Sequence, residues 1–378
     1  MTARGVALRA LARVDEGARA NVIVPELLRH SSLEQRDRHL VTELVYGTCR
    51  MQRACDWLVD RHARGRVDPD IRSALRLGAY QLGWTRIPSH AAVSATVAEV
   101  RGPGRSMVNA VLRRVAADVE RGVVTWPNRA TELSYPDWIV ERLSADLGRE
   151  AALEALVAMN EPASATVRAD GYIQDRASQM VAEHLVARAG SRVLDMCAAP
   201  GGKATGLAGG GATVVAADIS LSRARMMKSN AARLGTASVA TVVADGERAP
   251  FPPASFDLVL VDAPCSGLGV LRRRPDARWR VKAGDVERLV ALQRRLLASA
   301  AELVRPGGVV AYSVCTLSAA ETGGMDRWAR HQLSDFAPLP PPARPWRPAG
   351  RGALLLPQTE GTDGMFLLSL KRPGRDPS

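Results

Sequence analysis

Strand and helix patterns alternate through the second half of this 378-residue chain. Short apolar runs rich in valine predict strands, and longer amphipathic stretches between them predict helices. The predicted strands are Arg192–Met196, Thr213–Asp218, Val239–Asp245, Phe256–Asp262 and Gly308–Cys315, and two of the predicted helices are Leu221–Leu234 and Val286–Val304. This alternation is typical of an α/β fold, in which a doubly wound, mostly parallel sheet carries helices on both faces.

Ligands of such folds bind outside the carboxyl ends of the strands. The predicted strands bring acidic residues and one cysteine to that edge, namely Asp195, Asp218, Asp245, Asp262 and Cys315. A second cysteine, Cys265, follows the fourth predicted strand in V-D-A-P-C-S-G. We therefore expect Cys265 and Cys315 to be neighbours, although they are 50 residues apart in the sequence.

Residues 191–203 (S-R-V-L-D-M-C-A-A-P-G-G-K) predict a buried strand, a tight glycine turn and the start of a helix. A nucleoside triphosphate loop is excluded, because Ala204 follows Lys203 and Cys197 stands where the first glycine would be. The G-x-G-x-x-G pattern of dinucleotide sites is also absent. S-adenosylmethionine remains, and backbone N–H groups at the helix start, helped by Lys203, could hold its carboxylate.

Two acids fit the rest of that cofactor. Asp218 could accept hydrogen bonds from the ribose hydroxyls, and Asp245 one from the adenine amine. Each acid alone also fits a helix cap, Asp218 especially because it precedes I-S-L-S.

The first 122 residues predict an all-α module. The helical stretches are one that contains Val6, Leu8, Leu11 and Val14, and then Arg38–Arg53, Ile71–Leu82, Ala91–Val100 and Met107–Val119. Their basic faces fit either simple solvation or contact with RNA. Residues 123–162 predict a linker with small helices, and 163–378 a catalytic domain. Within the latter, the proline-rich stretch 335–350 predicts an extended connector, and 354–357 and 365–371 a closing antiparallel pair.

Composition narrows the class of protein. The net charge of +12 fits a nucleic-acid partner, or simply an arginine-rich composition from a GC-biased genome. No apolar run predicts a membrane span or a signal peptide, so we expect a cytoplasmic protein. The five cysteines lack C-x-x-C spacing, which argues against a disulfide framework and a zinc site, and we expect no metal. Each cysteine is then either a small buried hydrophobe or a nucleophile.

Several stretches resemble known families. D-M-C-A-A-P-G-G-K resembles the signature of the NOL1/NOP2/Sun family of RNA cytosine-C5 methyltransferases. The N-terminal stretches R-D-R-H-L-V-T-E-L-V-Y-G-T, L-R-L-G-A-Y-Q-L, P-S-H-A-A-V and V-N-A-V-L-R-R resemble the NusB-like RNA-binding domain of bacterial rRNA methyltransferases of the RsmB (Fmu) type. The resemblance implies a Rossmann-like methyltransferase domain that uses S-adenosylmethionine and acts on RNA, with small-subunit ribosomal RNA as the expected substrate. A monomer is favoured.

The implied chemistry gives the cysteines different tasks. A thiolate that adds to C6 of cytosine makes C5 nucleophilic, and a donor at N3 absorbs the developing charge. Physical reasoning alone leaves open which cysteine attacks, because DNA cytosine methyltransferases use a Pro-Cys nucleophile. The RNA family implies Cys315 as the nucleophile, Cys265 in product release and Asp262 as the contact to N3. It implies cofactor contacts from Cys197, Ala198, Ala199, Pro200, Gly201, Gly202, Lys203, Asp218, Asp245 and Asp262.

Other features stay open at the level of sequence. The family's Asn-x-Pro…Arg and Q-D segments match Asn160, Pro162, Arg168, Gln174, Asp175 and Gln179, which fit either local packing or RNA contact. The run Arg272-Arg273-Arg274 could favour ionisation of a cysteine or hold RNA phosphates. Two departures concern peripheral contacts: only Glu321 remains of a Glu-Asn-Glu run, and D-G-M-F replaces D-G-F-F. A transfer-RNA target and a non-catalytic RNA-binding or ribosome-assembly factor are the alternatives.

Overall fold

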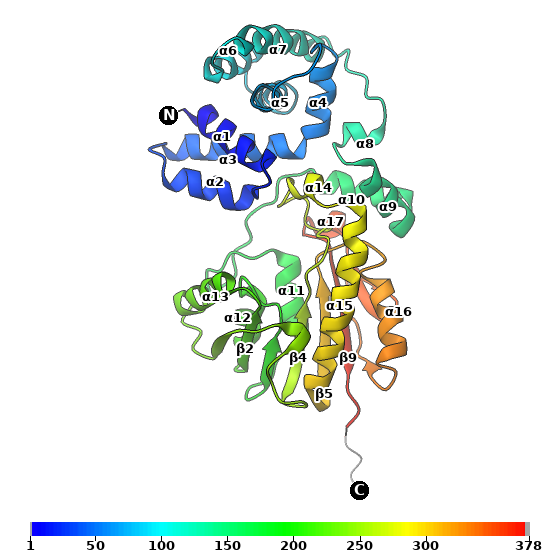
Figure 1. The fold of residues 1–378 in the computed structure, drawn as a ribbon. Helices are drawn as coiled ribbons and strands as arrows, with labels where there is room; N and C mark the ends of the chain where they lie inside the picture. Colours follow the sequence, from blue (N-terminus) through cyan, green and yellow to red (C-terminus); the bar gives the residue numbers. More distant parts are fainter. Residues whose placement is uncertain (1, 375–378) are drawn as a thin grey trace. The chain divides into compact units, whose positions relative to one another are not determined.

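The structure is a computed structural model that describes residues 2–374 (Figure 1). The chain forms two compact units. The first contains the chain up to Glu141 together with Leu271–Val281, and the second contains Arg142–Val270 and the chain from Lys282 onward. This division differs from the predicted boundaries at residues 122 and 162, because it places 123–141 with the helical unit and returns a later segment to it.

The first unit is helical, as predicted. Its helices are α1 (Ala3–Asp15), α2 (Ala20–Arg29), α3 (Gln35–Arg50), α4 (Gln52–Asp60), α5 (Pro69–Trp84), α6 (Ser89–Glu99), α7 (Gly104–Glu120) and α8 (Arg129–Glu132). Apolar faces such as Val6, Leu44, Leu75 and Leu112 meet in one core. The sequence analysis missed α2, which contains Pro25, and it extended α3 to Arg53, whereas α3 ends at Arg50 and α4 begins at Gln52.

The segment Leu271–Val281 is an integral part of this helical unit. The fully buried guanidinium of Arg278, in α14 (Ala277–Arg280), lies 3.8 Å from the ring centroid of Tyr135. It donates hydrogen bonds to the backbone oxygens of Arg50 (3.1 Å) and Ser134 (3.3 Å). The indole of Trp279 donates to the backbone oxygen of Cys49 at 2.7 Å. The arginine run at 272–274 therefore belongs to a segment that packs with helices, which the linear proximity to Cys265 did not indicate.

The second unit is built on one sheet with the order β3-β2-β1-β4-β5-β9-β8-β7, and β6 also pairs with β9. The strands are β1 (Arg192–Asp195), β2 (Thr213–Asp218), β3 (Val239–Val243), β4 (Phe256–Asp262), β5 (Val304–Val314), β6 (Ala337–Pro338), β7 (Arg347–Ala349), β8 (Gly352–Leu355) and β9 (Met365–Lys371). The first five are parallel to one another, and β9 runs antiparallel to β5. The strand order reverses between β1 and β4, which is where a doubly wound sheet opens for a ligand.

Helices cover both faces of this sheet. On one face, α11 (Arg176–His184), α12 (Gly202–Ala208) and α13 (Leu221–Arg233) share a core with Leu258, Leu260 and Ala311. Side chains alternate along a strand, so Tyr312 points to the other face. There its hydroxyl donates to the side chain of Gln293 in α15 (Ala283–Leu303) at 3.0 Å. Figure 1 shows α15 running along β4 and β5, and α16 (Gly323–Gln332) contacts α15.

The closing part of the sheet confirms one prediction and corrects another. The strands β8 and β9 pair antiparallel, as expected for 354–357 and 365–371. The proline-rich stretch 335–350 is more than a connector, because β6 and β7 lie in the sheet and Trp346 is buried in the core. The remaining elements are α9 (Asp137–Leu147), α10 (Arg149–Ala158), η1 (Gly246–Arg248) and α17 (Pro357–Glu360). Within residues 2–374, no helix is long and apolar enough to cross a membrane.

Candidate active site

The carboxyl ends of neighbouring strands bring the predicted residues together. The strands β1 and β4 end at Asp195 and Asp262, and β5 ends one residue before Cys315. The register pairs Asp262 with Ser313, so the loops after β4 and β5 leave the sheet side by side. The Sγ atoms of Cys265 and Cys315 lie 3.4 Å apart, which confirms that the two cysteines are neighbours.

The two sulfurs are close but not bonded as a disulfide, and both cysteines are half-buried. The hydrogen bond with Cys315, followed by burial, raises the pKa of the Cys265 thiol well above its ordinary value, and the carboxylate of Glu321 adds to this shift. Cys265 therefore holds its proton at neutral pH. Burial also raises the pKa values of Cys49, Cys55 and Cys197, which argues against a nucleophilic role for these three thiols.

An ion pair lies at the same edge of the sheet. The ammonium of Lys203 donates to Oδ2 of Asp262 at 2.7 Å, and the lysine side chain is only 8% exposed. Burial lowers the pKa of Lys203, but the charge and hydrogen bond of Asp262, with a smaller contribution from Cys315, raise it above the ordinary value. Lys203 is thus a permanent cation near the cysteine pair, held by Asp262. The sequence had assigned these two residues to separate tasks.

The glycine turn has the predicted form. Gly201, with φ of +101°, precedes α12 in a left-handed conformation that favours glycine. A Cβ atom on Gly202 would lie 2.9 Å from side-chain atoms of both Tyr172 and Gln174, so a larger residue there would force these side chains to shift. Residues of the hairpin formed by 166–174 therefore pack tightly against this turn.

That hairpin belongs to the segment whose role the sequence left open. Arg168 donates to the backbone oxygen of Gly202 (2.6 Å) and to the side chain of Gln174 (3.1 Å). Asp175 caps α11 by accepting from the N–H of Ala177 at 2.9 Å. These contacts support a packing role for the segment, in which Arg168 braces the start of α12.

Asp218 and Asp245, two acids at or near strand ends, differ in how exposed they are. Asp218 is 5% exposed and accepts from the N–H of Ser220 at 2.9 Å, while Ser220 itself stands at the N-cap of α13. Asp245 is exposed and caps η1 through the N–H of Glu247 at 3.0 Å. The helix-cap interpretation therefore applies to Asp245, which stays exposed.

Asp195 is the residue that the sequence analysis placed at the rim but gave no role. It is fully buried, and neither carboxylate oxygen accepts a hydrogen bond of normal geometry from the described residues, although the N–H of Cys197 is near enough to lower the pKa. Burial, followed by the charge of Asp262, raises the pKa of Asp195 to about 8. A buried acid in this state beside the glycine turn fits a ligand that brings its own hydrogen-bond donors.

A further residue was treated at the sequence level as peripheral. Glu321 is fully buried, and its Oε1 accepts from the N–H of Ser266 (2.8 Å) and the side chain of Gln293 (3.0 Å). Its Oε2 accepts from the hydroxyls of Ser266 and Thr316. The lone acid left in A-A-E-T-G-G was the available signal, but only the tertiary fold shows that it connects the two cysteine loops.

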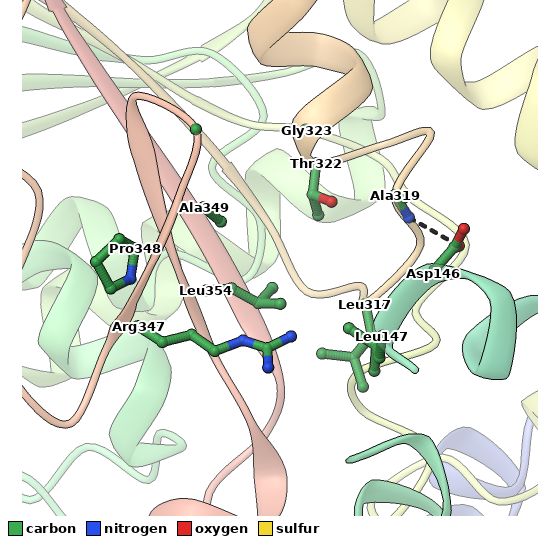
Figure 2. Close-up of a pocket in the computed structure, with 11 residues that line it drawn as sticks. Asp146, Leu147, Leu317, Ala319, Thr322, Gly323, Arg347, Pro348, Ala349 and Leu354 are labelled. Carbon is green, nitrogen blue, oxygen red and sulfur yellow. Dashed lines mark hydrogen bonds between the residues drawn. The ribbon is translucent and has the colours of Figure 1, made fainter. Parts of the chain in front are cut away.

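A cavity of about 310 Å³ lies beside the loop that follows Cys315. Figure 2 shows the guanidinium of Arg347 near Leu317, and Asp146 accepting a hydrogen bond from the N–H of Ala319, which measures 2.8 Å. The lining residues are Asp146, Leu147, Leu317, Ala319, Thr322, Gly323, Arg347, Pro348, Ala349, Gly350 and Leu354. This cavity lies on the outer side of the loop, and none of the predicted site residues lines it. Among residues 2–374 no cluster of three metal-ligating side chains occurs.

Comparisons with known proteins agree with this geometry. The model of a family described as "16S rRNA methyltransferase RsmB/F" matches residues 182–371, and that of the NusB family matches residues 1–117. The ribosomal RNA small subunit methyltransferase B of Thermus thermophilus is 37% identical over 98% of both chains. A protein of Mycobacterium tuberculosis is 36% identical over 97% of this chain and 94% of its own length. The crystal structure named PH0851 shares the fold, with a TM-score of 0.78 and 21% identity over 98% of this chain and 99% of that one.

Proposed function

Since the chain belongs to the 16S rRNA methyltransferase RsmB/F family and is an S-adenosylmethionine-dependent RNA methyltransferase, we propose that it methylates C5 of a cytosine in small-subunit ribosomal RNA through a covalent Cys315 adduct. One observation carries the finer part of this proposal: two sulfurs that follow neighbouring strands lie 3.4 Å apart, beside the ion pair of the buried Lys203 with the partly exposed Asp262. A methyltransferase that acts on a more nucleophilic nitrogen or oxygen would not need a paired thiol.

The reaction requires a nucleophile because C5 of cytosine is unreactive. The thiolate of Cys315 forms a bond to C6, and the electron pair of the C5–C6 double bond moves toward C5 and N3. S-adenosylmethionine, when bound, supplies an electrophilic methyl group to C5. Loss of the C5 proton then restores the double bond and expels the sulfur of Cys315. The target base must be unpaired or flipped out to reach this edge of the sheet.

The charges around the sulfurs support the division of labour between the cysteines. Lys203 is a cation whose pKa responds to Cys315, so it favours a thiolate on that sulfur. Cys265 lies next to Ser266, which binds the Glu321 carboxylate, and it keeps its proton. A protonated Cys265 can donate to the Cys315 sulfur as this leaves C6, which gives Cys265 a role in product release.

The lysine–aspartate pair also fits the base. Negative charge develops at N3 after the thiolate has added to C6. A proton shared by Lys203 and Asp262 can stabilise this charge. We assign Asp262 the contact to the Watson–Crick edge of cytosine. Lys203 then has two functions, which are to hold Asp262 and to favour the thiolate of Cys315.

Residues 197–203 with Asp218 and Asp245 are proposed to hold S-adenosylmethionine. A Cβ at Gly202 would crowd the side chains of Tyr172 and Gln174, and the exposed Asp245 lies past the third strand, where an adenine amine would be met. Asp195 adds a buried acceptor for the amino group of the cofactor. The fit supports a nucleoside cofactor at the switch between β1 and β4.

The helical unit is proposed to bind RNA, since its first 117 residues match the NusB family. Ribosomal RNA is favoured over transfer RNA because the Thermus thermophilus relative is a ribosomal RNA small subunit methyltransferase. A non-catalytic assembly factor would have no need for the two cysteines and the Lys203–Asp262 pair, so the enzyme is favoured.

The proposal is tested by methyl transfer from radiolabelled S-adenosylmethionine to small-subunit rRNA and to bulk transfer RNA. Bisulfite sequencing of the product then locates 5-methylcytosine. We expect one cytosine in ribosomal RNA to be protected. Label on adenine or on transfer RNA alone would refute the substrate assignment, and absence of cofactor binding by calorimetry would favour the assembly factor.

A further inference from the structure

The fully buried carboxylate of Glu321 reaches both cysteine loops. Its Oε1 accepts from the backbone N–H of Ser266, the residue after Cys265, at 2.8 Å. Its Oε2 accepts at 3.1 Å from the hydroxyl of Thr316, the residue after Cys315. The hydroxyls of Ser266 and Thr316 are also 2.8 Å apart. A single carboxylate therefore connects the residues that follow both sulfurs.

The rest of the network fixes Glu321 itself. Gln293 of α15 donates to Oε1 of Glu321 (3.0 Å) and to the backbone oxygen of Pro264 (2.9 Å). The hydroxyl of Tyr312, in β5, donates to the backbone oxygen of Glu321 at 2.8 Å. On the outer side, Asp146 holds the same loop through Ala319 (Figure 2). The acid is thus held by a helix, a strand and the loop's own backbone.

Burying a carboxylate without a cation is costly unless several hydrogen bonds satisfy it. Here four donated hydrogen bonds do so, from Ser266 (backbone and hydroxyl), Gln293 and Thr316. A network of this kind has one low-energy arrangement, because a shift of either loop leaves buried donors without a partner. The arrangement sets the positions of the two sulfurs, whose separation is 3.4 Å.

We propose that Glu321 is a positioning residue, whose carboxylate bridges the Cys265 and Cys315 loops and keeps the two sulfurs in register for addition and release. This inference rests on the proposed function for its catalytic meaning, but the bridge itself can be tested without RNA. It assigns a role to the one acid retained where related enzymes carry a longer acidic run.

The first experiment measures the proximity of the sulfurs directly. The full-length protein is treated with diamide, an azo oxidant that takes two hydrogens from a pair of thiols, and the Cys265–Cys315 disulfide is quantified by mass spectrometry of peptides. We expect rapid formation in the wild type and formation slowed by about tenfold or more in Glu321→Ala. Glu321→Gln, which keeps the shape but replaces an acceptor oxygen by a donor nitrogen, should be intermediate.

The matched control is Asp326→Asn. Asp326 is a buried carboxylate in the following helix, but its partners are Arg351 and Arg330, away from the cysteine loops. We expect this variant to lose thermal stability and to oxidise at the wild-type rate. Equal oxidation rates for folded Glu321→Ala and wild type would overturn the bridge. If Glu321→Ala is recovered unfolded, Glu321→Gln and Ser266→Ala decide by the same measurement.

The second experiment measures methyl transfer. Glu321→Ala should lower kcat about 100-fold and leave KM for RNA within about twofold, because misplaced reacting groups affect the chemical step. Glu321→Gln should recover part of kcat. An unchanged kcat in Glu321→Ala would overturn the inference. Absence of any Cys315 adduct in Cys265→Ala, in which release is expected to stall, would instead refute the proposed function, and the oxidation experiment would still report on the bridge.

Discussion

The ammonium of Lys203 donates a hydrogen bond to the carboxylate of Asp262 across 2.7 Å, beside the cysteine pair. One residue comes from the start of α12 and the other from the end of β4, so the pair joins the cofactor turn to the expected base site. The ammonium of Lys203 therefore offsets the negative charge of the Asp262 carboxylate and would also offset that of a Cys315 thiolate.

Lys203→Met should remove that balance with little change in volume. The thiolate of Cys315 and the carboxylate of Asp262 would then lack their cation, and we expect kcat for methyl transfer to fall by about 100-fold or more. Steady-state kinetics check this result. Asp262→Asn keeps the ammonium beside Cys315 but weakens the proposed contact to N3, so both adduct formation and methyl transfer should slow while the positive charge beside the thiolate is retained. A wild-type kcat in Lys203→Met would contradict the assignment.

Cys315→Ala should abolish methyl transfer, because the neighbouring thiol of Cys265 keeps its proton and burial also raises the pKa of the Cys197 thiol. The measurement is incorporation of label from S-adenosylmethionine into RNA, with RNA binding followed by filter retention to show that the site is intact. Turnover at the wild-type rate would refute Cys315 as the nucleophile.

Cys265→Ala should have a different effect. Addition by Cys315 would proceed, but the leaving sulfur would lose its hydrogen-bond donor, so the covalent protein–RNA adduct should accumulate and survive a denaturing gel. The double variant Cys265→Ala/Cys315→Ala is the control and should show no adduct. An adduct that requires Cys265 and forms without Cys315 would reverse the two roles.

Asp195→Asn tests the buried acid through the pH dependence of stability. The pKa of Asp195 is about 8 in the folded protein, far above the value of about 4 for an exposed aspartate. Between these two pH values the folded state binds one more proton than the unfolded state, so the free energy of unfolding falls as the pH rises toward 8. The wild type should lose up to about 1.4 kcal/mol of stability per pH unit in that window relative to the variant. Thermal unfolding between pH 5 and 9 measures this difference. Parallel curves for both proteins would show that Asp195 is ionised in the fold.

Arg278→Met tests the segment that returns to the helical unit. The side chain is fully buried, stacks on Tyr135 and donates to two backbone oxygens. Removing it leaves those oxygens unsatisfied, and we expect a loss of about 3 kcal/mol in the stability of the helical unit. Chemical denaturation of the full chain checks this value, with the exposed Arg288→Met as control. Equal midpoints would show that α14 contributes little to the unit.

Local sequence patterns predicted most of the helices and strands, because the conformation of each depends largely on residues that are close together in the sequence. The alternation after residue 190 identified the parallel strands, and the glycines after Pro200 identified the turn, since only glycine fits the positive φ at Gly201. The missed helix α2 contains Pro25, which lowers helical propensity, and is stabilised by apolar residues packed in the core. Trp346 is a similar case, because the prolines around it predicted an extended connector, whereas its side chain is buried.

By itself, the sequence determined that Asp262, Cys265 and Cys315 lie at or just after strand ends, and its resemblance to a methyltransferase family implied the class of chemistry. A side chain's place at the end of a strand depends on the local pattern alone. Only the tertiary structure decided that Lys203 meets Asp262, that Glu321 bridges the two cysteine loops and that Leu271–Val281 packs with the helices. These relationships depend on burial and on partners that are as many as 256 residues apart, as in the hydrogen bond from the N–H of Ala20 to the side chain of Asp276, and no local pattern encodes them.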